Sequence, residues 1–548
     1  MIQNYTPKLF SVFAEGYSAQ RLKADAIAGL TVAIVALPLS MAIAIASGLT
    51  PDRGLYTAII GGFLVSALGG SRHQIGGPAG AFIVLVALTV SRYGVEGLIL
   101  ATAMSGLFLM LAGIFRLGNY IKFIPFPVTV GFTAGIAVII FASQVSELFG
   151  LTLAEKEPGP LVEKLVALGG AVTTVNPSSV GVALLTIGTI LALRKYRPTW
   201  PGLLIAVCLA SVVTALLDLP VATIGTRFGG IPRSLPLPSL PHFTPDLAIA
   251  VLPDAIAFAL LGAIESLLSA VVADGMTGRR HRSNVELIGQ GIANIGSAIF
   301  GGMCVTGTIA RTATNVRAGG TSPLAGMLHA AFLLLFMAVA APLASYIPLA
   351  ALAGVLAIVA WNMVERPAVA AIIRSSRGDT VVLAVTFLLV IFRDLTEGIV
   401  VGFVLGALLF IDRMAKSVTV QPHTDDDTPE QPLDNTESDT VVYRIGGAFF
   451  FGAAATVGSV LDRIADRYRY FVLDCSAISF MDSTAANVIE GTVRKAERAG
   501  VAFYIVGASP KLRHLLQMHE VHTPRVHYAP NLETARARIA VQRNEKAA

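Results

Sequence analysis

Two glycine-rich segments of the chain have the composition of helix starts that could bind an anion. The first reads Gly-Gly-Pro-Ala-Gly-Ala-Phe over residues 76–82. Glycine pairs resist a helix and proline is favoured at the first helical position, so a helix should begin near Pro78. Its apolar run to Val90 is too short to cross a bilayer. The candidate anion-binding residues of this segment are Pro78, Ala79, Gly80 and Ala81.

The second segment covers residues 301–312, where a glycine pair and several threonines precede a short helix predicted over residues 308–317. A helix that begins inside a membrane leaves N–H groups that must face a cavity or a ligand, and their partial positive charge suits an anion. Two interrupted helices in corresponding places of two halves indicate a transporter's central site. Either segment alone is equally well explained by glycines packed on a neighbouring helix. The candidates here are Thr306, Gly307, Thr308 and Arg311.

An acidic residue in the middle of a long apolar run is the third chemical feature. Glu265 lies within the predicted span of residues 248–273, and Ser269 follows one helical turn later on the same face. An ionisable group inside a membrane is costly and is by default functional, so Glu265 could carry a proton. The alternative is a structural ion pair with Arg311. Arg311 could in turn attract the anion or only neutralise Glu265, and the sequence leaves both open.

The sequence lacks the motifs of enzymes and of nucleotide or metal proteins. It contains no Walker-type phosphate loop, no dinucleotide-binding glycine spacing and no arrangement of serine, histidine and aspartate. Cys208, Cys304 and Cys475 are scattered without the spacing of metal ligands. The lysines and arginines form no single basic stripe of the kind that binds nucleic acid. We therefore expect no enzymatic activity, no cofactor, no metal and no nucleic-acid partner.

The chain that must position these residues is strongly apolar. Only 14% of its 548 residues are charged, whereas soluble domains average about a quarter. Apolar runs recur through residues 24–416, and we predict about fourteen membrane elements, the two broken helices included. Basic residues, such as those at 194–197 and 279–282, fall on one side of the bilayer for that count. The positive-inside rule then places residues 1–23 and the C-terminus in the cytoplasm of a multi-pass inner (plasma) membrane protein.

The composition changes abruptly after Lys416. Residues 417–440, rich in Asp, Glu and Pro, form a predicted acidic linker that is too polar to pack. Residues 441–548 alternate strands with amphipathic helices, which predicts an α/β domain with a parallel or mixed sheet. The strands are expected at 441–445, 471–474 and 501–506. The helices are expected at 455–465, 483–499 and 510–518.

Four motifs of the chain resemble those of a known protein family. They are Leu37-Pro38-Leu39-Ser40-Met41-Ala42, Pro51-Asp52-Arg53-Gly54-Leu55-Tyr56, Gly77-Pro78-Ala79 and Asn315-Val316-Arg317-Ala318-Gly319-Gly320. With them the chain resembles the sulfate permease (SulP) family of anion transporters, and residues 441–548 resemble a STAS domain. The resemblance implies about fourteen transmembrane elements in a seven-plus-seven inverted repeat, with core and gate domains. The anion would lie between the starts of helices three and ten. The resemblance also implies a homodimer.

Glu265 matches the helix-eight position where family members carry an acid, and Ser269 matches the position one turn later. Sodium-coupled bicarbonate members carry aspartate there, so glutamate favours the proton over sodium as coupling ion. Two departures concern the first helix. Leu39 stands where many members have glutamine, and Ile43 where many have an aromatic residue. This wall is therefore more apolar here, which weakens substrate inferences from better-known members.

Residues 480–485 match the loop that anti-sigma antagonists phosphorylate. Asp482, Ser483 and Thr484 are therefore a possible phosphorylation loop, and a cytosolic regulator is a possible partner. Asp482 also fits a helix N-cap, and Ala485 replaces the usual glycine. We accordingly favour a structural cap without phosphorylation.

The leading hypothesis is secondary active transport of a small inorganic oxyanion, with sulfate first and protons as the driving ion. Bicarbonate or C4-dicarboxylate transport, or anion exchange, is the alternative within the same class. A second class is a membrane sensor that binds anions without flux and signals through the STAS domain. A third is a nucleobase permease, against which the STAS domain and Arg311 argue.

Overall fold

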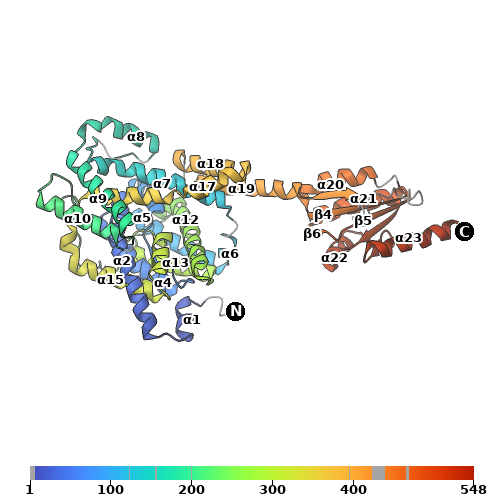
Figure 1. Cartoon of the computed structure of the whole chain (residues 1–548), viewed down its shortest axis with the longest axis horizontal. Coiled ribbons are helices and arrows are strands. Elements are labelled where there is room, and N and C mark those ends of the chain that lie inside the picture. Colours follow the sequence, from blue (N-terminus) through green and yellow to red (C-terminus); the bar gives the residue numbers. More distant parts are fainter. Residues whose placement is uncertain are drawn as a thin grey trace. The chain divides into compact units, whose positions relative to one another are not determined.

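The chain divides into two compact units, residues Met1–Phe403 and Val404–Ala548. The computed structural model describes residues 6–121, 124–154, 157–158, 160–198, 200–393, 395–422, 439–464 and 468–547. Figure 1 shows the first unit as a bundle of helices and the second as a sheet with helices packed on it. The apolar runs of the sequence therefore lie in the helical unit, except that the last of these helices (Leu395–Lys416) extends across the division into the second unit.

Helices make up nearly all of the first unit. Its first half contains α1 (Lys8–Ala14), α2 (Ala19–Ala46), α3 (Pro51–Tyr56), α4 (Gly62–Leu68), α5 (Ile83–Ile114), α6 (Gly118–Ile121), α7 (Phe126–Phe149), α8 (Leu161–Gly170), α9 (Pro177–Tyr196) and α10 (Gly202–Leu216). Its second half contains α11 (Ile224–Phe228), α12 (Pro245–Thr277), α13 (Ser283–Ile299), α14 (Ile309–Arg317), α15 (Leu324–Ala344), α16 (Leu349–Met363), α17 (Arg366–Ser375), α18 (Arg377–Phe392) and α19 (Leu395–Lys416). Within the described ranges, eight helices are long and apolar enough to cross a membrane.

Proline and glycine set the ends of several of these helices. α7, α9 and α12 each have a proline in the first two positions, where the missing N–H is not needed. α7 is followed by Gly150 and α12 by Gly278, with φ angles of 59° and 68°. Glycine adopts this left-handed conformation without strain and so ends a helix cleanly. The ends of these helices are thus determined by residues at or next to the ends themselves.

The long helix α5 consists of two helices that meet at Gly94. This residue has φ 68° and ψ −172°, which no helix contains. A 3-10 turn (η3, Gly80–Phe82) and residues 83–93 form the half-helix, and residues 95–114 form the next span. The short helix predicted near residues 78–90 is present. It begins two residues after Pro78, because Ala79 has the extended conformation of a cap residue.

The second unit is a mixed six-stranded sheet covered by helices. Its strands are β3 (Thr419–Pro422), β4 (Thr440–Phe449), β5 (Tyr470–Asp474), β6 (Ile478–Met481), β7 (Ala502–Val506) and β8 (His527–Ala529), and its helices are α20 (Phe451–Ile464), α21 (Ser483–Arg498), α22 (Pro510–Met518) and α23 (Leu532–Ala547). The strand order is β3-β4-β5-β7-β8, with β6 beside β4. β3 is antiparallel to β4 and the other pairs are parallel. The predicted α/β domain with a mixed sheet is confirmed.

Each strand and helix predicted for this unit overlaps an observed one, and several elements were not predicted. β6 and β8 are short, and α23 is too polar to show an apolar face in the sequence. β3 lies inside the segment assigned to the acidic linker, because Thr419–Pro422 pairs with β4 before the acidic run begins. Residues 423–438 of that linker lie outside the described residues.

Asp482 is the N-cap of α21, as the sequence indicated. Its Oδ1 accepts the Ala485 N–H at 2.9 Å, and its Oδ2 accepts the Phe451 N–H at 3.0 Å. The hydroxyl-bearing Ser483 and Thr484 are exposed at the first helical positions. The carboxylate therefore secures the starts of two helices, while the hydroxyl groups of the possible phosphorylation loop face outward.

We expect Asp482→Ala to lower the free energy of unfolding of the second unit by about 1–2 kcal/mol, because it removes the cap of α21 and the acceptor of the Phe451 N–H. The loss of stability is measured by heating the full-length protein and monitoring protease cleavage within residues 440–548 at each temperature. Ser483→Ala is the matched control, since its hydroxyl is exposed and no such loss is expected. Equal unfolding of wild type and Asp482→Ala would contradict the capping role.

Candidate functional site

The two half-helices begin side by side because a short antiparallel ladder joins the residues before them. Strand β1 (Gly76–Gly77) pairs with β2 (Thr306–Gly307), with Gly76 opposite Gly307 and Gly77 opposite Thr306. The Thr308 N–H continues this contact by donating to the Ile75 carbonyl oxygen at 3.3 Å. The structure thus brings together the two segments that the sequence singled out.

Neither helix start in this ladder has a side-chain cap. Ala79 precedes η3 and Thr308 precedes α14, and neither side chain accepts a bond from the turn that follows. At α12, by contrast, the Thr244 side chain accepts the Leu247 N–H. The first N–H groups of a helix have no partner within the helix. The first N–H groups of both half-helices therefore lie next to the ladder without a side-chain acceptor from the cap residue.

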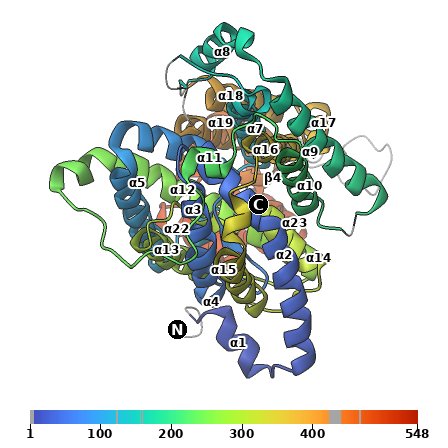
Figure 2. The same ribbon diagram turned by 90° about the vertical axis from the view of Figure 1, so that its left-hand side faces the viewer.

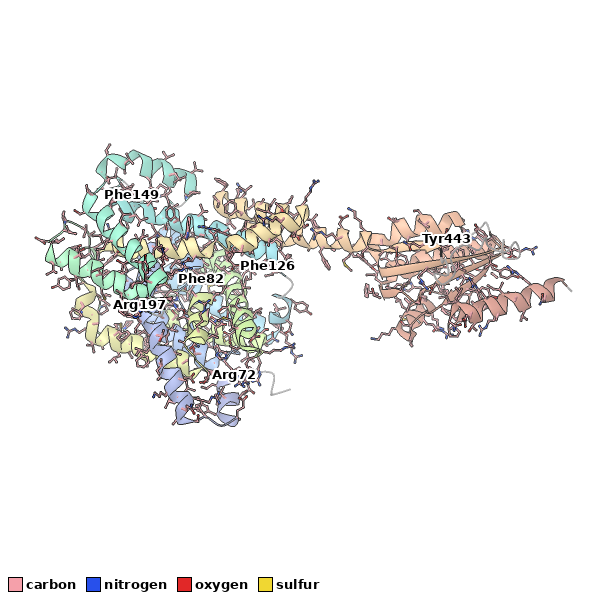
Figure 3. The ribbon with its side chains drawn as sticks, viewed as in Figure 1. Arg72, Phe82, Phe126, Phe149, Arg197 and Tyr443 are labelled. Atoms are coloured by element: carbon pink, nitrogen blue, oxygen red, sulfur yellow. The ribbon has the colours of Figure 1, made fainter. Side chains whose placement is uncertain are left out.

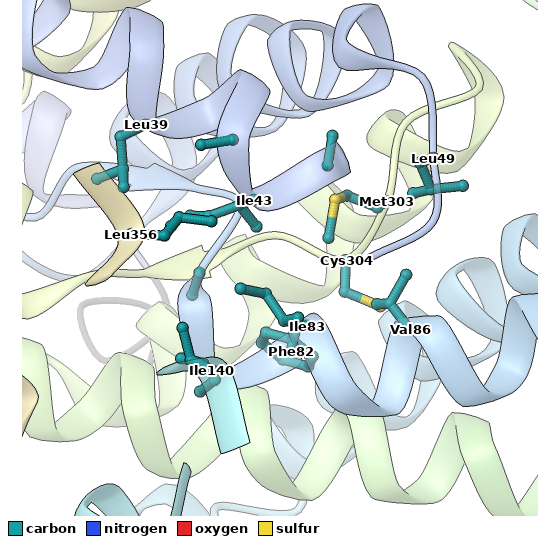
Figure 4. Close-up of a cluster of buried hydrophobic side chains, with 14 of the residues drawn as sticks. Leu39, Ile43, Leu49, Phe82, Ile83, Val86, Ile140, Met303, Cys304 and Leu356 are labelled. Atoms are coloured by element: carbon teal, nitrogen blue, oxygen red, sulfur yellow. The ribbon is translucent and has the colours of Figure 1, made fainter. Parts of the chain in front are cut away.

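Apolar side chains surround the start of the first half-helix. Figure 4 shows Phe82 and Ile83 close to Ile140, with Ile43 and Leu356 nearby. All five are buried in one hydrophobic cluster that also contains Leu39. Figure 3 shows Phe82 in the interior of the helical unit. The two first-helix departures from the family pattern therefore lie in this apolar wall, where low polarity strengthens the pull of the helix starts on an anion.

Arg311 is a fully buried cation beside the ladder. It is 2% exposed, and its Nη2 donates to Ser40 Oγ on α2 at 3.1 Å. Figure 2 shows α14, which carries Arg311, beside α2. A Cβ at Gly77 would lie 1.6 Å from Arg311 Nη1. Gly77 is therefore required for the guanidinium to reach the ladder, a reason that the sequence did not disclose.

Glu265 on α12 is partly buried, and its Oε2 is enclosed without a hydrogen-bond partner. Among the described residues no ion pair within 4 Å joins Glu265 to Arg311 or to another base. The structural ion pair with Arg311, which the sequence left open as the alternative, is thus not formed as a direct contact. Charge attraction between the two side chains still acts over the longer distance.

Within the described part of the chain, enclosed polar atoms without partners include Thr308 Oγ1 and Arg311 Nε and Nη1 at the second helix start. Another is Glu265 Oε2 on α12, one turn after Gly262, whose carbonyl oxygen bonds to Thr306 of β2. Buried polar atoms in proteins nearly always bond to protein, water or a ligand. An acceptor, a hydroxyl and a cation beside uncapped N–H groups are the components of a site for a hydrated or protonatable anion.

Two predicted site residues use their hydroxyls within the protein instead. Thr306 Oγ1 donates to the Gly262 carbonyl oxygen at 3.1 Å, and Ser269 Oγ donates to Thr312 Oγ1 at 3.0 Å. Thr312 Oγ1 also accepts the Ile75 N–H at 3.2 Å. Thr306 and Ser269 therefore join α12 to the ladder and to α14. Pro78, Ala79 and Ala81 are buried and Gly80 is partly exposed. Their side chains have no hydrogen-bonding group, so only their backbone could bond an anion.

Sequence reasoning missed a group of buried polar residues behind the ladder, namely Ser40, Gln74, Ser266 and Glu286. Glu286 is fully buried on α13. Its position within a largely apolar stretch was a usable signal. The other three are short or neutral polar residues whose partners come from distant segments, so nothing in their local sequence marked them.

The family of the chain follows from its match to known proteins. The sequence profile of the Sulfate permease family matches residues 22–386, and that of the STAS domain matches residues 431–535. The chain belongs to the sulfate permease family. It is an anion transporter of that family and not an enzyme. The STAS match covers the strands of the mixed sheet from β4 onward and leaves out β3.

Individual relatives agree with this assignment over most of their length. "Putative sulfate transporter YvdB" of Bacillus subtilis (strain 168) is 41% identical over 514 residues, covering 92% of this chain and 95% of the relative. "Bicarbonate transporter BicA" of Synechocystis sp. (strain ATCC 27184 / PCC 6803 / Kazusa) is 32% identical over 526 residues, covering 92% and 91%. The solved structure of SLC26A9 has a TM-score of 0.84 at 17% identity, covering 100% of this chain and 94% of that one. This likeness confirms the expected fold of a helical membrane part with a C-terminal STAS domain.

Proposed function

We propose that this sulfate permease family member carries a small inorganic oxyanion, with sulfate as the first substrate, by secondary active transport. The pairing of β1 with β2 is the observation that carries this proposal. It places the uncapped starts of two half-helices next to each other, with buried Arg311 alongside. Two helix starts supply N–H donors and positive partial charge to an anion with several acceptor oxygens.

Ten residues have proposed roles at this site. Pro78, Ala79, Gly80 and Ala81 form the first helix start, Thr306, Gly307 and Thr308 form the second, and Arg311 adds the charge. Glu265, supported by Ser269, is the proposed coupling residue. A proton on Glu265 offsets the anion's charge as the core domain moves against the gate domain in alternating access. Sodium is the alternative coupling ion.

The seven-plus-seven inverted repeat is part of the same proposal. An inverted repeat relates its two broken helices by a two-fold axis in the membrane plane. Antiparallel pairing of β1 with β2 is the arrangement that such an axis produces. The domain limits at residues 23/24, 416/417 and 440/441, the cytoplasmic termini, the inner-membrane location and a homodimer belong to the proposal as well. So does a cytosolic regulator that binds the STAS domain near Asp482, Ser483 and Thr484.

Bicarbonate is the second candidate substrate, because one relative that covers nearly the whole chain is named as a bicarbonate transporter. C4-dicarboxylates and anion exchange are further alternatives. A competition panel of sulfate, bicarbonate, chloride and succinate against labelled sulfate uptake, in proteoliposomes at pH 6 and pH 8, decides among them. We expect unlabelled sulfate to compete best and uptake to be faster at the lower pH.

The same vesicles test the sensor hypothesis. A non-transporting sensor binds anions and shows no flux above that of protein-free vesicles. Uptake of labelled sulfate that exceeds the protein-free control and saturates with concentration excludes the sensor. Absence of labelled sulfate uptake above the protein-free control would contradict the proposed transport of sulfate.

A further inference from the structure

Buried Gln74 lies where three elements behind the anion site meet. Its Nε2 donates to Ser266 Oγ on α12 at 2.7 Å and to Glu286 Oε1 on α13 at 2.9 Å. All three side chains are buried, Gln74 with 2% exposure and the others with none. Gln74 stands two residues before β1, and Ser266 follows Glu265. One amide therefore links the first strand of the ladder to the helix that carries the proposed coupling acid.

The same side chain also fills the space next to the second strand of the ladder. A Cβ at Gly307 would lie 1.8 Å from Gln74 Nε2 and 2.3 Å from its Cδ. Glycine at position 307 is therefore needed for Gln74 to take this place. Gln74 contacts both segments whose ends form the proposed anion site, although it lies outside that site.

Glu286 determines which way the Gln74 amide points. Its Oε2 accepts the N–H groups of Gly70 and Ser71 at 2.8 and 3.0 Å. Its Oε1 accepts the amides of Gln74 and Gln290, the latter at 3.2 Å. In all four of these contacts the carboxyl oxygens of Glu286 are the acceptors, so the NH2 group of Gln74 must face them. Glu286 thus holds both the loop before β1 and the amide that contacts β2.

We infer that Gln74, oriented by Glu286, is a positioning residue that sets the spacing of the two helix starts and thereby the affinity for the anion. It acts through the ladder and not by contact with the anion. The inference rests on the proposed function in one respect, since it takes the helix starts as the anion site. Its structural content, that Gln74 holds the ladder together, can be measured in the absence of any anion.

Gln74→Ala in the full-length protein tests the inference with two measurements. In proteoliposomes we expect KM for sulfate to rise about tenfold with the maximal rate unchanged, because two hydrogen bonds that order the site are lost. In the anion-free protein we expect faster hydrogen exchange in peptides covering residues 303–312, where the ladder opens more often. A general loss of folding would instead lower the maximal rate and raise exchange throughout the unit.

Gln290→Ala is the matched control. The substitution removes a hydrogen bond to the same Glu286 oxygen, and among the described residues the Gln290 side chain forms no hydrogen bond with β1 or β2. We expect its KM and its exchange in residues 303–312 to equal those of wild type. Gln74→Ala that behaves like Gln290→Ala in both measurements would overturn the inference.

An exchanged pair provides a rescue that a merely structural role would not show. Gln74→Glu alone sets two carboxylates against each other, and we expect it to raise KM at least as much as Gln74→Ala. Adding Glu286→Gln restores a hydrogen-bond donor that faces an acceptor. We therefore expect the KM of the double variant to return most of the way to the wild-type value. A double variant no better than Gln74→Glu contradicts the pairing.

The two proposals fail in different ways. Wild type without flux for any anion contradicts the proposed function, and hydrogen exchange alone then decides the inference about Gln74. Wild-type flux with exchange in residues 303–312 unaltered by Gln74→Ala contradicts the inference and leaves the transport function standing.

Discussion

Replacement of Glu265 by glutamine is expected to abolish the response of uptake to a proton gradient. One proton carried per anion adds about 1.4 kcal/mol, or tenfold accumulation, for each pH unit across the membrane. Wild-type vesicles at internal pH 7.5 and external pH 6.5, with the membrane potential clamped, should therefore accumulate labelled sulfate about tenfold more than vesicles without a gradient. Glu265→Gln cannot release or take up the proton, and its accumulation should be the same in both conditions.

Asp254→Asn is the matched control for this experiment. Asp254 is another acid on α12, and its Oδ1 accepts the Thr89 hydroxyl at 3.1 Å. Asp254 lies about three helical turns before Glu265 in α12. We expect Asp254→Asn to keep the tenfold response. A full response in Glu265→Gln would remove Glu265 from the coupling mechanism, and a response that instead follows an imposed sodium gradient would identify sodium as the coupling ion.

Replacement of Arg311 by glutamine is the second change with a large expected effect. Arg311 is a buried cation beside uncapped helix starts, and its Nε and Nη1 have no hydrogen-bond partner in the part of the chain that the structure describes. Losing a charged hydrogen bond to the anion should raise KM for sulfate about 100-fold, equivalent to ~2.7 kcal/mol. Initial rates of sulfate uptake over a wide concentration range measure this. Arg317→Gln, at the exposed end of the same helix, is the control and should leave KM unchanged.

A double variant separates the two roles of Arg311 that the sequence left open. If Arg311 only neutralises Glu265, then Glu265→Gln together with Arg311→Gln removes both charges and should restore wild-type KM. If Arg311 attracts the anion, the double variant should remain about 100-fold weaker. We expect the second result, because no direct ion pair joins the two side chains. Restoration of KM would show that Arg311 serves charge balance alone.

The local chemistry of the chain allowed the elements around the site to be predicted. Glycine and proline interrupt the helices before residues 80 and 309, and these signals act on the backbone of the residues that carry them. The apolar runs predicted a helical membrane part, and the abrupt change after Lys416 predicted a separate α/β domain. In the second unit Asp482 was identified as a cap, because capping depends on residues only three apart.

Contacts between distant segments could not be predicted in the same way. The β1–β2 ladder, the bond from Arg311 to Ser40 and the position of Gln74 between Ser266 and Glu286 all join segments far apart in the sequence. The sequence predicted Thr306 as an anion-binding residue and Ser269 as an ion-coupling residue beside Glu265. The fold uses both hydroxyls to hold α12 against the ladder and α14. The type of a side chain determines which hydrogen bonds it can form, and its neighbours in the folded structure determine which of them it does form.

By itself the sequence determined a membrane body with two broken helices, an acid and a base at membrane depth, and an α/β domain after an acidic segment. These features depend on composition and on signals within a few residues. The tertiary structure decided that the broken helices begin side by side and that Glu265 and Arg311 form no direct pair. It also decided that the Arg311 guanidinium occupies the space that a side chain at position 77 would fill. Such features arise because close packing and the pairing of buried polar groups are satisfied across the whole fold and not along the chain.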